Sequence, residues 1–75
     1  MDFYIYLKDR DKCICLDGIT MVQTFDKEGH KMVFDSENIN DFNLFDAHKE
    51  IHFLGNHNFI VPVKQIIAID HDHSI

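Results

Sequence analysis

Apolar and polar side chains alternate along much of the chain. In residues 2–7, Phe3, Ile5 and Leu7 fall on one side and the residues between them on the other, which is the period-two pattern of a half-buried strand. Further short runs rich in β-branched and aromatic residues follow at close spacing, in residues 13–16, 19–25, 30–34, 59–61 and 66–70. The pattern therefore predicts a chain made mainly of short strands.

Turn-forming residues separate these runs. Asp17-Gly18 is the signal of a two-residue hairpin, because both residues tolerate the positive φ of a type I′ turn. Asp26-Lys27-Glu28-Gly29 fits a longer hairpin loop, and residues 36–41 read as a polar loop with at most one helical turn. We therefore expect an all-β fold, a small antiparallel meander or SH3-like barrel of six to eight short strands.

Residues 42–54 allow two interpretations. One is a single helix capped by Asp41 and Gly55, which would make the fold α+β. The other is a pair of strands, 42–45 and 50–54, that turn at residues 46–49. Three phenylalanines fall off the apolar stripe of the helix, and Asn, Asp, His and Phe are mediocre helix formers, so we favour the two strands.

The end of the chain resembles the closing turn of SH3-like barrels. An apolar run ends at Pro62, and a second apolar run begins four residues later, at Ile66. The likeness covers residues 59–70 and implies the fold alone, because the acidic loop and aromatic pair of a peptide-binding SH3 groove are absent from the sequence. We expect one β domain over residues 1–70, followed by a flexible tail of residues 71–75.

Charge restricts the classes of partner. The chain has 75 residues, with Lys+Arg 7 against Asp+Glu 13 and a formal net charge of -6, so direct binding to nucleic-acid phosphates is not expected. No apolar run is long enough for a membrane span, and charges interrupt the first one too early for a signal peptide. We expect a cytoplasmic protein. A composition rich in Ile, Asn, Asp and Lys suggests an AT-rich source, a low-GC bacterium or its phage.

Strand order assigns the charges to two ends of the molecule, because successive turns of an up-and-down chain alternate between its ends. The mixed end collects seven bases and six acids, a net charge of +1, in residues 8–12, 26–28, 31, 46, 49, 50 and 64. The acidic end collects seven acids and no base, a net charge of -7: Asp2, Asp17, Asp35, Glu37, Asp41, Asp70 and Asp72. Such clustering costs stability by mutual repulsion, which suggests a use, although turn-forming aspartates in solvated loops would give the same pattern.

No residue pattern indicates catalysis. Cys13 and Cys15 point to one face of a presumed strand, where a disulfide would be strained, and no second cysteine pair completes a zinc site. His30, His48, His52 and His57 show no ligand spacing, and His71-Asp72-His73 could chelate a transition metal only if the end of the chain were held in place. Neither serine lies beside a base, and the glycines are isolated. We therefore expect that the protein is not an enzyme and that it binds no metal and no cofactor.

These observations favour a non-catalytic module that binds a protein with a basic surface. Small acidic proteins of this character include phage-encoded inhibitors of host defence or nucleic-acid-handling proteins, such as anti-CRISPR and DNA-mimic proteins. A small-ligand or cation-binding β domain and a homo-oligomeric phage structural module remain alternatives. Nine phenylalanine and tyrosine side chains in so small a chain also suggest a homodimer. The expected contact residues are Asp2, Tyr4, Tyr6, Asp17, Asp35, Glu37, Asp41, Asp70 and Asp72.

Overall fold

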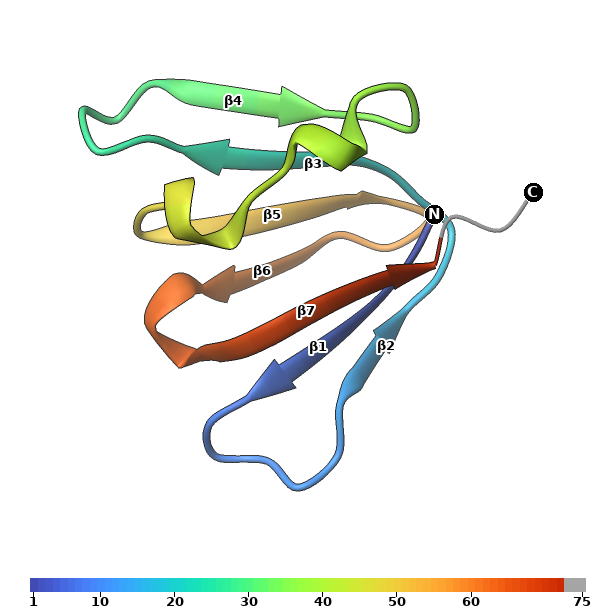
Figure 1. Cartoon of the computed structure of the whole chain (residues 1–75). Helices are drawn as coiled ribbons and strands as arrows, with labels where there is room; N and C mark the ends of the chain where they lie inside the picture. The colour runs from blue at the N-terminus through green and yellow to red at the C-terminus, as the bar shows by residue number, and fades with distance from the viewer. Residues whose placement is uncertain (73–75) are drawn as a thin grey trace.

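Two antiparallel sheets make up the computed structural model, which describes residues 1–72 (Figure 1). The first sheet has the order β2-β1-β7, and the second has the order β4-β3-β5-β6. The strands of the first are β1 (Asp2–Leu7), β2 (Ile14–Leu16) and β7 (Ile66–Asp72). Those of the second are β3 (Ile19–Phe25), β4 (Lys31–Phe34), β5 (Glu50–Gly55) and β6 (Phe59–Pro62). The predicted all-β antiparallel class is therefore confirmed.

Side chains from both sheets form the core. The alternation in β1 buries Phe3, Ile5 and Leu7, as the period-two pattern predicts. Phe53 of β5 is fully buried, and its ring centroid lies 5.1 Å from that of Phe3, so this aromatic pair joins the two sheets. The core also includes Ile19, Val22, Ile39, Ala47, Ile51, Val61 and Ile66.

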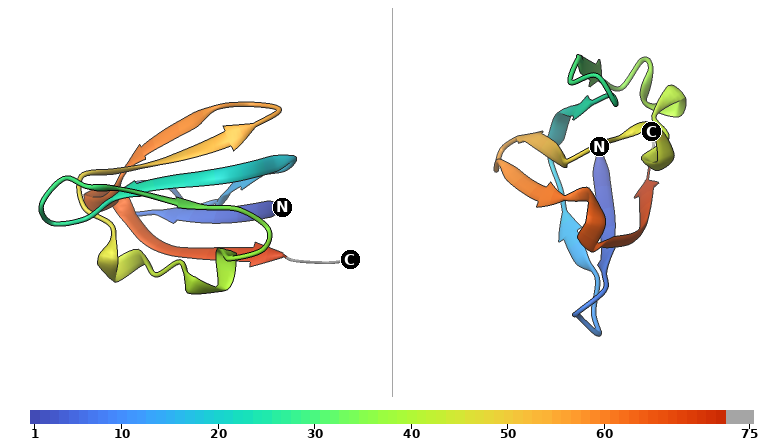
Figure 2. Two further views of the ribbon diagram at one scale, coloured as in Figure 1. Left: turned by 90° about the horizontal axis from the view of Figure 1, so that it is seen from above. Right: turned by 90° about the vertical axis from the view of Figure 1, so that its left-hand side faces the viewer.

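The strand order departs from a simple meander. β4 lies at the edge of its sheet, and β5 pairs with β3 on the opposite side from β4. Residues 35–49 therefore cross from one end of the second sheet to the other, by way of the short 3-10 helices η1 (Ile39–Asp41) and η2 (Leu44–Asp46). Figure 2 shows this crossing segment on the same side of the molecule as β7.

Both interpretations of residues 42–54 need correction. A helix over 42–54 is wrong, because β5 occupies residues 50–55 and η2 is a 3-10 helix of three residues. The expected strand 50–54 is confirmed, whereas the expected strand 42–45 is wrong. Instead, Asn43 Oδ1 accepts a hydrogen bond from the Phe45 backbone N–H at 3.0 Å and caps η2.

Asp17-Gly18 is not a hairpin turn. β2 pairs with β1, whereas β3 pairs with β4 and β5, so the chain passes at this point from the first sheet to the second. Gly18 has a φ of 66°, which supplies the left-handed conformation expected at this site. The dipeptide thus bends the chain between sheets instead of pairing its neighbours.

The end of the chain keeps the predicted arrangement of strand, short connection and strand. The 3-10 helix η3 (Val63–Gln65) links β6 to β7. β7 continues through Asp72, so His71 and Asp72 of the expected tail belong to the first sheet. Residues 73–75 of that tail lie outside the described residues.

Candidate functional site

The two ends defined from the sequence lie at opposite ends of the sheets. In Figure 1 the N-terminus and the turns at residues 17–18, 35–38 and 56–58 lie at one end. The turns at 26–30 and 47–49 and η3 lie at the other. Residues 35–49 return the chain to the mixed end, as the expected strand 42–45 would have done. The turns that follow therefore lie at the ends expected from the sequence.

Backbone hydrogen bonds join the segments of the acidic end. The Met1 ammonium donates to the Ile19 carbonyl oxygen at 2.8 Å, and the Asn56 N–H donates to the Gly18 carbonyl oxygen at 3.2 Å. These bonds place Asp17 beside the start of β1, where Asp2 is paired with Asp72. The N-terminal ammonium therefore contributes a positive charge among the carboxylates that the side-chain sum of -7 does not include.

The outward face of the first sheet adds tyrosines to these carboxylates. Tyr4 is directly opposite Asp70 of β7, and opposite Cys15 of β2 on its other side. Partial burial, followed by the charges of Asp72 and Asp2, raises the pKa of the Tyr4 phenol. The phenol therefore stays protonated near neutral pH and can donate a hydrogen bond.

Tyr6 occupies the next outward position of β1. The charge of Cys13, followed by partial burial and the charge of Asp70, raises the pKa of the Tyr6 phenol. Its side chain is 40% exposed, and residue 68, which is opposite it on β7, is alanine. Tyr6 thus presents an accessible ring on the outward face of the sheet, on the half of β1 that lies toward the mixed end.

The acidic side chains in and after the loop that follows β4 differ in their contacts. Asp35 Oδ1 accepts the Glu37 N–H at 2.9 Å, and Asn38 Oδ1 accepts the Asp35 N–H. Asp35 therefore shapes the turn, as turn-forming aspartates do. Glu37 and Asp41 are exposed, and no such contact ties their carboxylates to the loop. The exposed pair is better placed than Asp35 to meet a partner.

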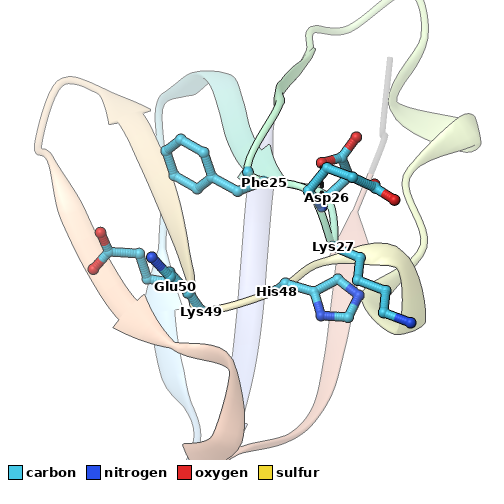
Figure 3. Close-up of a pocket in the computed structure, with 8 residues that line it drawn as sticks. Phe25, Asp26, Lys27, His48, Lys49 and Glu50 are labelled. Atoms are coloured by element: carbon cyan, nitrogen blue, oxygen red, sulfur yellow. Dashed lines mark hydrogen bonds between the residues drawn. The ribbon is translucent and has the colours of Figure 1, made fainter.

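A cleft of about 590 Å³ lies at the mixed end (Figure 3). It forms where the His48 N–H donates to the Phe25 carbonyl oxygen and the Val63 N–H donates to the Lys49 carbonyl oxygen, both at 2.8 Å. None of the contact residues expected from the sequence lines this cleft. Its lining carries charges of both signs. The residues that line it are Phe25, Asp26, Lys27, Glu28, Gly29, His48, Lys49 and Glu50.

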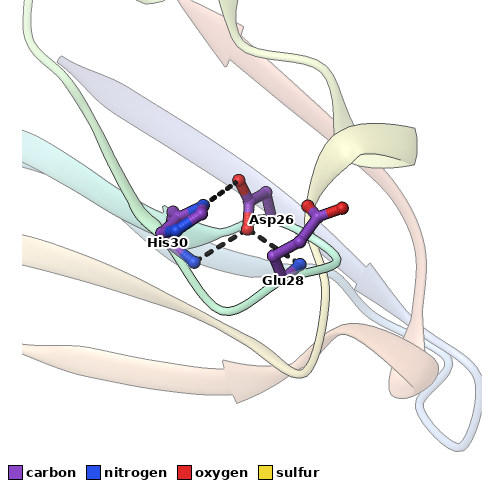
Figure 4. A group of neighbouring side chains, drawn as sticks. All are labelled: Asp26, Glu28 and His30. Atoms are coloured by element: carbon purple, nitrogen blue, oxygen red, sulfur yellow. Dashed lines mark hydrogen bonds and ion pairs between the residues drawn. The ribbon is translucent and has the colours of Figure 1, made fainter.

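The hairpin between β3 and β4 brings together three groups that were not expected to meet. Asp26 Oδ1 accepts the backbone N–H groups of Glu28 at 3.0 Å and His30 at 2.7 Å, and Asp26 Oδ2 lies 3.2 Å from His30 Nδ1 (Figure 4). Ligand atoms of Asp26, Glu28 and His30 all lie within 4.8 Å of one another. The Asp-x-Glu-x-His spacing in a glycine-closed loop is the sequence signal that could have identified the cluster.

Removing the Asp26 carboxylate should destabilise the fold at neutral pH and have a smaller effect in acid. The hydrogen bond from the His30 backbone lowers the pKa of Asp26 below its ordinary 3.8. A carboxyl group whose pKa is lower in the folded state stabilises that state above its unfolded pKa, and the contribution is lost as the pH falls through the folded value. Urea unfolding of Asp26→Ala and the parent at pH 7 and near pH 2 measures this. An equal difference in unfolding free energy at both pH values would contradict the assignment.

Comparisons with known proteins found no relative of this chain. Neither the family models nor the curated proteins nor the solved structures contain a match to this chain. Within residues 1–72, no helix has the length and apolar character needed to cross a membrane.

Proposed function

We propose that the protein binds another protein through its acidic end and that the partner presents a basic surface. One observation carries this proposal: the segments that hold seven acidic residues lie at one end of the sheets, and the segments that hold the Lys and Arg residues lie at the other. A field of one sign over one face attracts a surface of the opposite sign and excludes surfaces of the same sign.

The tyrosines support a protein partner over a simple ion. Tyrosine is enriched in protein interfaces because it combines apolar area with a hydrogen-bonding hydroxyl. Tyr4 and Tyr6 lie on the outward face that carries Asp70, so a partner that reached the carboxylates would also contact the rings. The proposed contact surface therefore offers both steering charge and area to bury.

We propose that the binding is non-catalytic and inhibitory. A compact acidic domain that covers a basic surface would exclude whatever that surface normally holds, such as nucleic acid. A phage-encoded inhibitor of a host defence or nucleic-acid-handling protein would act in this way. The cytoplasm of the bacterial host is the compartment in which that role would be exercised.

A second candidate function rests on the cleft at the mixed end. Its volume of about 590 Å³ falls in the range of small-molecule sites, and Lys27, Lys49 and Glu50 could fix the orientation of a charged ligand. A small-ligand domain would use this cleft and leave the acidic end in solvent. The two functions thus use opposite ends of the same molecule.

Titration with a lysine-rich peptide, followed by backbone amide chemical shifts, tests the proposal. Shift changes are expected to gather at residues 2–6, 17–18, 35–41 and 70–72 and to disappear as salt is raised, because screening shortens the reach of the carboxylates to about 8 Å near 0.15 M salt. A neutral peptide of the same length is the control. Changes that are spread evenly over the surface, or that gather around Phe25 and Lys49, would contradict the proposal.

A further inference from the structure

The two cysteines lie closer together than an extended strand implies. Cys13 precedes the first residue of β2 and is half-buried, whereas Cys15 is exposed within β2. Both thiols are reduced, and their Sγ atoms lie 3.9 Å apart. Because Cys13 lies outside the strand, its sulfur approaches that of Cys15 at the surface.

This Sγ–Sγ distance matches the separation of two sulfur ligands that bind the same zinc ion. Two Zn–S bonds of about 2.3 Å at a tetrahedral angle place their sulfur atoms about 3.8 Å apart. A disulfide bond requires about 2.05 Å, so the sulfurs would have to move almost 2 Å closer to form one. Thiolates are also the ligands that select zinc over harder cations. The pair can therefore hold two of the four positions around a zinc ion as it stands.

One chain does not complete the site. Within the described residues, the group of three or more candidate ligands that the fold assembles is Asp26, Glu28 and His30, and neither cysteine belongs to it. Within residues 1–72, β2 is an edge strand that pairs with β1 alone, and Cys15 is exposed on it, so a second molecule can reach the thiols. The missing two ligands can come from there.

We propose that Cys13 and Cys15 form one half of a zinc–thiolate site that is completed by the same two residues of a second copy of the chain. On binding, each of the four thiols loses a proton to solvent and each sulfur donates an electron pair to Zn²⁺, with no change of oxidation state.

Charge complementarity favours this assembly. Four thiolates around one Zn²⁺ leave a net charge of -2. Residues 8–12, which lead into Cys13, carry three bases and two acids, a net charge of +1 in each copy. The two loops therefore neutralise the cluster that they would flank.

Zinc titration of the reduced protein with light scattering tests the proposal. We expect a shift from the mass of one 8.9 kDa chain to twice that mass, at one zinc per two chains, and reversal by a chelator. With Co²⁺ in place of zinc, thiolate-to-metal absorption should appear at the same ratio. Cys15→Ser, at an exposed position, should remove both the mass change and the absorption while the circular dichroism stays unchanged.

His30→Ala is the matched control, because it disables the cluster at Asp26 and leaves the thiols in place. It should leave the zinc stoichiometry and the mass change unaltered. No zinc binding, one zinc per chain at the mass of a monomer, a dimer that forms without zinc, or binding that His30→Ala abolishes would each overturn the proposal. These readouts involve no binding partner, so they are independent of the proposed function.

Discussion

Replacing Phe53 with alanine should remove most or all of the stability of this domain. Phe53 is 0% exposed, pairs with Phe59 on β6 and contacts Phe3 across the two sheets. Truncation of a buried phenylalanine costs about 3–5 kcal/mol, because the transfer free energy is lost and a cavity is left. A chain of 75 residues buries too small a core to compensate for a loss of that size.

Phe45→Ala provides the matched control for this prediction. Phe45 is 90% exposed in η2, so the same truncation there should change the unfolding free energy by less than about 0.5 kcal/mol. Urea unfolding followed by circular dichroism measures both variants. Equal losses in the two variants, or a fully stable Phe53→Ala, would show that the two sheets do not share the core described for them.

Local alternation of side chains predicted the strands well, because each buried strand must show its apolar side chains to one face. β1 illustrates this, since Phe3 and Ile5 are fully buried while Tyr6 between β1's inward positions is exposed. The hairpin at residues 26–30 was also readable, because Gly29 adopts a φ of 90° where the loop closes. These features depend on neighbours in sequence.

Residues 42–45 show where that reasoning fails. Phe42 and Leu44 are partly buried and Asn43 and Phe45 are exposed, so the segment satisfies the alternation of a strand. It forms no strand, although the preceding strand, β4, lies at the edge of its sheet. Instead, Phe42 and Leu44 pack against the core, and residues 44–46 form η2. Whether a segment extends a sheet or packs over the core depends on the whole chain, and a local pattern does not contain it.

The same limit applies to Asp17-Gly18 and to the candidate site. The need for positive φ at Gly18 was readable, but whether its flanking strands pair with each other depends on β1 and β5. Strand order likewise assigned the turns to the two ends of the sheets, whereas the internal hydrogen bonds of Asp35 and Asp26 and the cleft beside Phe25 required coordinates. Contacts of this kind depend on side-chain positions that spacing alone does not fix.

Charge reversal at the acidic end should abolish binding to a basic partner and preserve the fold. The structure selects Glu37, Asp41 and Asp70, which are exposed, and spares Asp35, whose carboxylate shapes its loop. Lysine at these three positions changes the acidic end from -7 to -1, because each site changes by two charges. Both the steering field and the direct contacts would be lost.

The matched triple lies at the mixed end. Asp9, Glu28 and Asp46 are also exposed, and lysine at these positions changes that end from +1 to +7. Either triple brings the net charge from -6 to zero, so the two variants differ in the location of charge and not in its total. Asp26 is left unchanged, because its hydrogen bonds hold the β3–β4 hairpin.

The dissociation constant of a fluorescent lysine-rich peptide, measured at low salt for the parent and both triple variants, tests the central claim most directly. The proposed acidic binding surface predicts at least about tenfold weaker binding for Glu37→Lys/Asp41→Lys/Asp70→Lys and a change within about threefold for Asp9→Lys/Glu28→Lys/Asp46→Lys. Circular dichroism should show the same fold in all three proteins. Equal loss of binding in the two triples would contradict the claim, because it would mean that total charge governs binding wherever the carboxylates lie.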